Sequence, residues 1–199
     1  MKQLENRNLL IGIGLIVVGI LGVTYFAYFR SLDINQAYNI AENYLDSIID
    51  PDIAIDEVME FEYNYYVVYY EKSTNIGAFE MLIDKENGHI FPEYGPNMMW
   101  NLKYGHGGMM GSGGMMGGGY YYPDVEPITV DAALGIAQRF LDETYPGSMA
   151  EEAHQFYGYY TIHTMRNGEI QGMLSVNEYT GAVWYHNWHG KYIQSIESH

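Results

Sequence analysis

The 199-residue chain lacks cysteine and has few basic residues, with nine lysines and arginines against 25 aspartates and glutamates. The absence of cysteine excludes disulfide bonds, thiolate metal sites and thioether-linked haem. The formal net charge of −16 and the lack of a basic patch argue against nucleic acid as a partner. The fold therefore depends on an apolar core, for which 21 tyrosines and a hydrophobic content of 48% provide material.

Catalytic sequence motifs are also lacking. The chain has no His-Glu-x-x-His, no Gly-x-Ser-x-Gly and no phosphate-binding glycine loop followed by Lys-Ser or Lys-Thr. Ser112 lies among glycines, where no neighbouring base would be fixed against it. Acidic pairs such as Asp56-Glu57 and Glu151-Glu152 are expected to be solvated surface groups. We therefore predict that the protein is not an enzyme.

One long apolar run is present near the N-terminus. Residues Leu9 to Phe29 carry no charge, and as a helix they would extend about 30 Å, the thickness of a hydrocarbon core. The run ends in bulky aromatic residues rather than in the small-x-small pattern of a cleaved signal peptide. The flanking Lys2 and Arg7 favour a cytoplasmic N-terminus. Residues 1–30 thus predict a retained single-pass anchor in the cell membrane, with the C-terminal part extracytoplasmic.

An internal repeat organises the rest of the chain. The segment 34–46 matches the segment 130–142 at an offset of 96 residues. Apolar residues recur at helical spacing in both copies, which predicts two amphipathic helices. Asp33 and Thr129 precede the two copies and are favourable N-cap residues. The identical pairs are Ala37/Ala133, Ile40/Ile136, Ala41/Ala137, Leu45/Leu141 and Asp46/Asp142.

The similarity continues beyond each helix. Segments 61–70 and 156–164 are rich in aromatic and β-branched residues and predict strands. Segments 81–91 and 174–184 each predict a strand, a turn at Gly88 or Gly181, and a short second strand. The sequence therefore predicts an α+β fold of two repeated modules, each with a helix packed on an antiparallel sheet. The predicted boundaries are 31–97 for the first module, 98–123 for a Met/Gly-rich linker and 124–199 for the second.

Both modules share short motifs: a helix with Ala-x-x-x-Ala, a strand with Tyr-Tyr, and a hairpin with an Asp or Asn before a glycine turn. The residues are Ala133, Ala137, Tyr159, Tyr160, Val176, Asn177, Thr180, Gly181 and Val183 in the second module, and Ala37, Ala41, Tyr65, Tyr66, Ile83, Asp84, Gly88 and Ile90 in the first. Through these residues both modules resemble the PepSY domain. The resemblance implies a non-catalytic regulatory, inhibitory or binding module, of a kind found in propeptides of thermolysin-type peptidases and in membrane-anchored extracytoplasmic proteins. It provides no catalytic residues, and it does not account for the Met/Gly-rich linker.

The linker is a candidate metal site. Thioether sulfur is a soft ligand suited to Cu(I), imidazole also binds copper, and a glycine-rich chain can wrap around an ion with little strain. Copper is therefore a candidate cofactor. The alternative is a flexible linker whose methionines rest on an apolar surface. The candidate ligands are Met98, Met99, His106, Met109, Met110, Met115 and Met116.

Histidines offer a second candidate metal site. His186 and His189 follow a predicted strand and precede Gly190, so a turn could bring both imidazoles to one ion. The alternative is simple packing among Asn187 and Trp188. His89 and His163 are predicted to lie on strands as surface or interface residues, and His154 has no informative context.

The leading functional hypothesis is a non-enzymatic, membrane-anchored extracytoplasmic binding or regulatory protein, acting as an accessory subunit of a membrane complex. This hypothesis requires a protein partner at the outer face of the membrane. One alternative is an extracytoplasmic Cu(I)-binding protein that uses the Met/His/Gly segment. A second alternative, which comes from the family resemblance alone, is a peptidase-inhibitor module.

Overall fold

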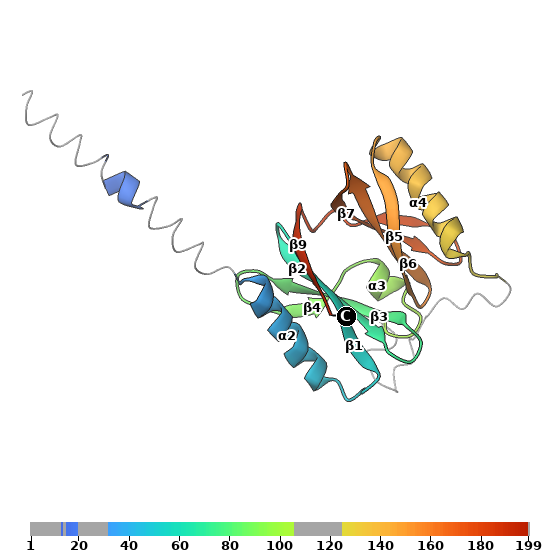
Figure 1. Cartoon of the computed structure of the whole chain (residues 1–199), viewed down its shortest axis with the longest axis horizontal. Coiled ribbons are helices and arrows are strands. Elements are labelled where there is room, and N and C mark those ends of the chain that lie inside the picture. Colours follow the sequence, from blue (N-terminus) through green and yellow to red (C-terminus); the bar gives the residue numbers. More distant parts are fainter. Residues whose placement is uncertain (1–12, 14, 20–31, 106–124, 199) are drawn as a thin grey trace, which may run out of the picture.

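The computed structural model describes residues 13, 15–19, 32–105 and 125–198. Within residues 32–105 and 125–198, three helices and nine strands form the two modules. Figure 1 shows their arrangement. The first module contains α2 (Ile34–Ser47), β1 (Ile53–Phe61), β2 (Asn64–Glu71), β3 (Ile76–Asp84), β4 (Ile90–Pro92) and α3 (Pro96–Met99). The second contains α4 (Val130–Thr144), β5 (Met149–Phe156), β6 (Tyr159–Arg166), β7 (Glu169–Asn177), β8 (Val183–Tyr185) and β9 (Tyr192–Glu197).

The helices begin where the repeat predicts. Asp33 forms a capping box with Gln36, and the Thr129 side chain accepts a hydrogen bond from the Ala132 amide. These caps satisfy amide groups that have no partner within the helix. The small residues of the repeat, Ala37, Ala41, Ala133 and Ala137, are fully buried. The helix faces predicted from the repeat therefore pack against the sheet in both modules.

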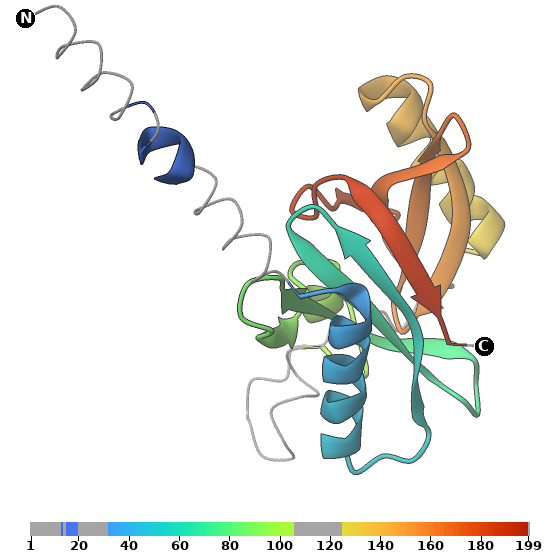
Figure 2. The same ribbon diagram turned by 60° about the vertical axis from the view of Figure 1, so that its left-hand side comes forward.

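The sheet is larger than the sequence predicts. Each module forms the expected antiparallel meander, but the two meanders join into one mixed sheet in the order β8-β7-β6-β5-β3-β2-β1-β9, with β4 paired to β3. The modules join where β3 and β5 run parallel, with Gly77 opposite Phe156. The final strand β9 leaves the second module and pairs with β1 of the first (Figure 2). The tail of one repeat therefore completes the sheet of the other.

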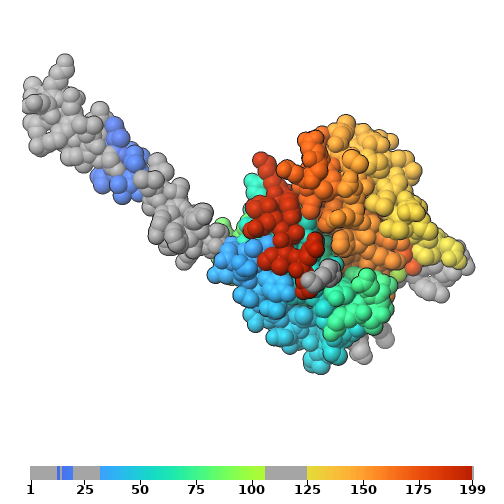
Figure 3. Space-filling view, in the orientation of Figure 1, coloured from blue at the N-terminus to red at the C-terminus, as the bar shows by residue number. Residues whose placement is uncertain are grey.

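Three apolar cores follow from this arrangement. One core lies under α2 and another under α4, and these helices cover the outer faces of the two modules (Figure 1). The third core lies between the modules, where inward-facing side chains of β1–β3 meet those of β5–β7. The β9 strand fits between the two modules (Figure 3). The inner faces of the sheet are therefore the place where residues of both modules come together.

The predicted anchor at Leu9–Phe29 lies mostly outside the described residues. Residues 13 and 15–19 are helical and exposed. Within the described part of the chain, no helix has the length and apolar character needed to cross a membrane.

Candidate functional site between the two modules

The first strand of each module contains a β-bulge at the same place in the repeat. The register shifts between Ile55 and Glu57 in β1, and between Glu151 and Ala153 in β5. The extra residues are Asp56 and Glu152, and Glu152 has a positive φ of 52°. A bulge bends the strand and redirects its side chains. Both bulges direct chemistry-bearing side chains toward the space between the modules.

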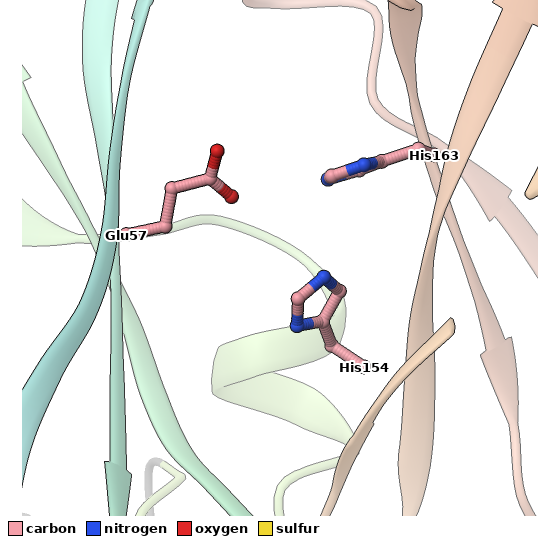
Figure 4. Close-up of side chains that lie close together, drawn as sticks. All are labelled: Glu57, His154 and His163. Atoms are coloured by element: carbon pink, nitrogen blue, oxygen red, sulfur yellow. The ribbon is translucent and has the colours of Figure 1, made fainter. Parts of the chain in front are cut away.

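Next to these bulges, Glu57 of β1 meets His154 of β5 and His163 of β6 (Figure 4). One ligand atom from each residue lies within 4.8 Å of the other two. Glu57 and His163 are buried, and His154 is partly buried. Figure 4 shows the Glu57 carboxylate facing the two imidazole rings. One acidic and two imidazole groups from both modules thus converge on one point.

The carboxylates of the two bulge residues, Asp56 and Glu152, lie next to the Nδ1 atoms of the two histidines. Glu152 Oε2 lies 2.9 Å from His163 Nδ1, and Asp56 Oδ2 lies 3.5 Å from His154 Nδ1. An ionised carboxylate can only accept hydrogen bonds, so it favours the tautomer in which Nδ1 carries the proton and donates. Each neutral ring then presents the lone pair of Nε2. This carboxylate–histidine arrangement is the one that orients metal-ligating histidines in proteins.

The surroundings shift the pKa values of the three groups in different directions. Burial raises the pKa of Glu57, partly opposed by a hydrogen bond with Ser195. Burial and the neighbouring His154 lower the pKa of His163. The hydrogen bond to Asp56 raises the pKa of His154. A cation placed among the three would stabilise the ionised glutamate and the neutral imidazoles together, which is the form that binds metal.

The cluster lines a pocket of about 540 Å³. The wall is strongly acidic, because Asp56, Glu57, Glu152 and Glu197 all contribute to it. An acidic concave surface concentrates cations. The remaining lining residues are Ala153, His154, His163, Met165, Ile170, Tyr192 and Ser195. The pocket leaves room beside the two histidines and Glu57 for water or an exogenous ligand.

One sequence prediction about these residues is wrong, because Glu57 was expected to be solvated but is buried. His163 was expected on a strand as a surface or interface residue, and it lies in β6, 3% exposed, where the two modules meet. The bulge is responsible in the case of Glu57, because it shifts the alternation of inward and outward residues by one. A signal was present: the apolar residues Ile53, Ile55 and Val58 break the two-residue spacing of a strand.

His186 and His189, predicted as candidate ligands, lie in a separate cluster. Both follow β8 and approach Glu93, which follows β4. His186 also stacks on Trp188, with ring centroids 4.8 Å apart, so the predicted aromatic packing is present at the same place. Among the predicted methionine ligands, Met98 and Met99 end α3, and Met99 is exposed. The rest of this set, His106, Met109, Met110, Met115 and Met116, lies outside the described residues.

No family model matches the chain, and no curated protein sequence matches it. Among solved structures, the chain is similar to the Bacillus megaterium YpeB C-terminal domain, with 15% sequence identity and a TM-score of 0.28. The aligned region covers 77% of this chain and 62% of that one, which is less than two thirds of its length.

Proposed function

We propose that the chain is a non-enzymatic, membrane-anchored extracytoplasmic protein that binds a divalent transition-metal ion at Glu57, His154 and His163. The observation that supports this proposal is the paired geometry of the two histidines. Each has its Nδ1 next to a carboxylate of its own, and both face one buried glutamate. Two imidazoles and a carboxylate suit Zn²⁺ and Cu²⁺.

The origin of the ligands supports a regulatory role. Glu57 comes from the first module, whereas His154 and His163 come from the second. An ion bound to all three joins the modules, so its binding free energy stabilises their association. The pocket beside the ion provides a position for a fourth ligand from water or from a partner. Metal binding would thereby control how tightly the two modules associate and which surface they present to a partner.

The ligand set separates this proposal from Cu(I) binding by methionines. Imidazole and carboxylate are harder ligands than thioether and favour Zn²⁺ over Cu(I). The pocket binds its ion through β-strand residues, whereas the methionine hypothesis relies on the Met/Gly-rich linker. Substitutions in the pocket and in the linker therefore test the two hypotheses independently.

Calorimetric titration of Zn²⁺ into the metal-free full-length protein in detergent tests the pocket. The variants His154→Asn and His163→Asn keep a donor near the position of Nδ1 but remove Nε2. His89→Asn is the matched control, because His89 stacks on Phe91 outside the cluster. We expect each pocket variant to lose one equivalent of bound Zn²⁺ and the control to lose none. A double variant that binds as many Zn²⁺ ions as the wild type, with the same affinity, contradicts the proposal.

The accessory-subunit part of the proposal rests on the apolar run at Leu9–Phe29 and on the resemblance of both modules to a binding domain. Affinity purification of the tagged full-length protein from native membranes tests it. We expect a stoichiometric membrane-protein partner in a single complex. Recovery of the chain alone after gentle solubilisation and crosslinking contradicts this part without affecting the metal proposal.

A further inference from the structure

A second cluster, formed by Glu93, His186 and His189, lies deep between the modules. One ligand atom from each residue lies within 4.8 Å of the other two. The exposed fractions of the three residues are 0%, 3% and 1%. Glu93 and His186 hold corresponding places in the repeat, since each comes directly after the short fourth strand and donates its amide hydrogen to the neighbouring long strand. The first module thus contributes the acid, and the second contributes both histidines.

The hydrogen bonds of His189 fix which of its nitrogens faces the acid. Asn64 Nδ2 donates to the Trp188 carbonyl oxygen, which orients the amide. Asn64 Oδ1 then accepts from His189 Nδ1 at 2.8 Å. A neutral His189 therefore keeps a lone pair on Nε2, and Nε2 lies 3.0 Å from Glu93 Oε1. A lone pair and a carboxylate oxygen repel each other at this distance unless a proton or a cation lies between them.

A chain of hydroxyl groups fixes His186 in the same way. Thr161 donates its only hydroxyl proton to Glu80 Oε1 at 2.6 Å, so Ser175 donates to Thr161 at 3.1 Å. Ser175 then accepts from His186 Nε2 at 2.9 Å. A neutral His186 therefore keeps its lone pair on Nδ1, which lies 3.2 Å from the same Glu93 Oε1.

Two buried atoms at this point have no hydrogen-bond partner among the described residues. They are Glu93 Oε2 and His186 Nδ1. Buried polar atoms without a partner are uncommon, and each one calls for an explanation such as strain, a catalytic role, or a bound water or ion. The Trp188 indole donates to Glu93 Oε1 rather than to Oε2. Among the ion pairs of the described residues, none joins a lysine or arginine to Glu93.

We infer that Glu93, His186 and His189 bind a buried zinc-type divalent ion that fastens the two modules together. The ligand atoms would be a carboxylate oxygen of Glu93, Nδ1 of His186 and Nε2 of His189. Ligand atoms about 2.0–2.1 Å from a tetrahedral Zn²⁺ are separated by about 3.3 Å. The two nitrogens lie 3.2 and 3.0 Å from Glu93 Oε1, close to that separation. The partnerless Oε2 provides a further donor atom for the same ion.

Because this site is buried, its ion should leave more slowly than the ion in the pocket. A chelator reaches the pocket of Glu57, His154 and His163 directly, because the pocket is open to solvent. The buried ion has no such access and leaves only when the modules separate or unfold. We therefore expect the wild-type protein to hold two Zn²⁺ ions, of which the second is lost slowly.

Native mass spectrometry of the zinc-loaded full-length protein counts the ions before and after brief exposure to EDTA. We expect two ions before treatment, one after it, and none after unfolding in denaturant with EDTA. Loss of all zinc in one fast phase overturns the inference. This measurement needs no substitution, so it does not depend on how well a variant folds.

Two substitutions then assign the retained ion. His186→Gln keeps a donor for Ser175, and His189→Asn keeps a donor for Asn64, while each lacks the nitrogen that faces Glu93. We expect each folded variant to lose the EDTA-resistant ion and to keep the EDTA-sensitive one. His163→Asn should give the reverse result. Retention of the EDTA-resistant ion by both His186→Gln and His189→Asn overturns the inference. Failure of the pocket proposal would be seen separately, as the absence of an EDTA-sensitive ion or as its retention in His163→Asn.

Discussion

Gly77 is the residue at which the two modules join, and replacing it by alanine should weaken the whole assembly. Gly77 pairs with Phe156 in the parallel contact of β3 and β5. A Cβ atom on Gly77 would lie 2.5 Å from two carbons of the Phe156 ring. This separation is far below van der Waals contact, so either the ring or the backbone must move.

The Phe156 ring has little freedom to move. Phe156 is fully buried and stacks on Tyr159, with centroids 4.8 Å apart and ring planes 7° apart. Overpacking of a filled core costs about 1–3 kcal/mol. Loss of the glycine's freedom in the unfolded chain returns about 0.4–1 kcal/mol. We therefore expect Gly77→Ala to lower the free energy of unfolding by about 1–2 kcal/mol, measured by urea unfolding of the full-length protein in detergent.

Two controls make this prediction specific. Gly135 lies in α4, and no atom of the part of the chain that the structure describes lies within 4 Å of a Cβ added there, so Gly135→Ala should stabilise the protein by about 0.5–1 kcal/mol. Replacing Phe156 by leucine should reduce the cost of Gly77→Ala in a double-mutant cycle. A Gly77→Ala variant as stable as the wild type would refute the steric argument, and so would a cost that Phe156→Leu leaves unchanged.

Three further outcomes follow from the structure. Ala41 of α2 and Ala137 of α4 are fully buried. Ala41→Leu and Ala137→Leu should therefore each lower the free energy of unfolding in urea by about 1–3 kcal/mol. A change below about 0.5 kcal/mol would contradict the close packing of helix and sheet. Burial alone would raise the pKa of Glu71, but hydrogen bonds from Lys103, Tyr104 and Tyr157 lower it to about 2. Because the folded pKa of Glu71 lies below its ordinary value, the ionised carboxylate stabilises the fold above about pH 4.5, and this stabilisation is lost as the pH falls toward 2. Glu71→Gln should therefore flatten the loss of stability between about pH 5 and pH 3. A parallel loss of stability in the wild type and the variant would contradict this role of Glu71. Glu152→Gln should weaken Zn²⁺ binding at the pocket about 10- to 100-fold, because Glu152 contacts the Nδ1 atom of His163. The Glu152 side chain is 70% exposed, so the far-ultraviolet circular dichroism should not change. Unchanged Zn²⁺ affinity would show that Glu152 does not support the site.

The sequence predicted the local elements of the fold well, because their determinants are local. Helical spacing, N-caps at Asp33 and Thr129, and the turns at Gly88 and Gly181 all act within a few residues. The continuous sheet depends instead on contacts far apart in the chain. The pairing of Gly77 with Phe156 and of β9 with β1 leaves no periodic trace in the sequence, so neither was predicted.

The candidate site was predicted less well for the same reason. His186 and His189 lie close together in sequence, and the turn between them was predictable, but their acidic partner Glu93 comes from the other module. The pocket of Glu57, His154 and His163 depends on two bulges that redirect side chains between modules. The repeat aligns Asp56 with Glu152, so the two bulges could have been compared. Glu152 meets His163 on the neighbouring strand of its own module, but Asp56 and Glu57 meet the histidines only where the two modules come together.

Crystals of the protein grown with Zn²⁺, measured on both sides of the zinc absorption edge, test most directly whether Glu57, His154 and His163 bind a divalent metal ion. We expect an anomalous peak about 2.0–2.2 Å from Nε2 of both histidines and from a carboxylate oxygen of Glu57. An anomalous map that shows zinc elsewhere on the protein but none between these three side chains would contradict it.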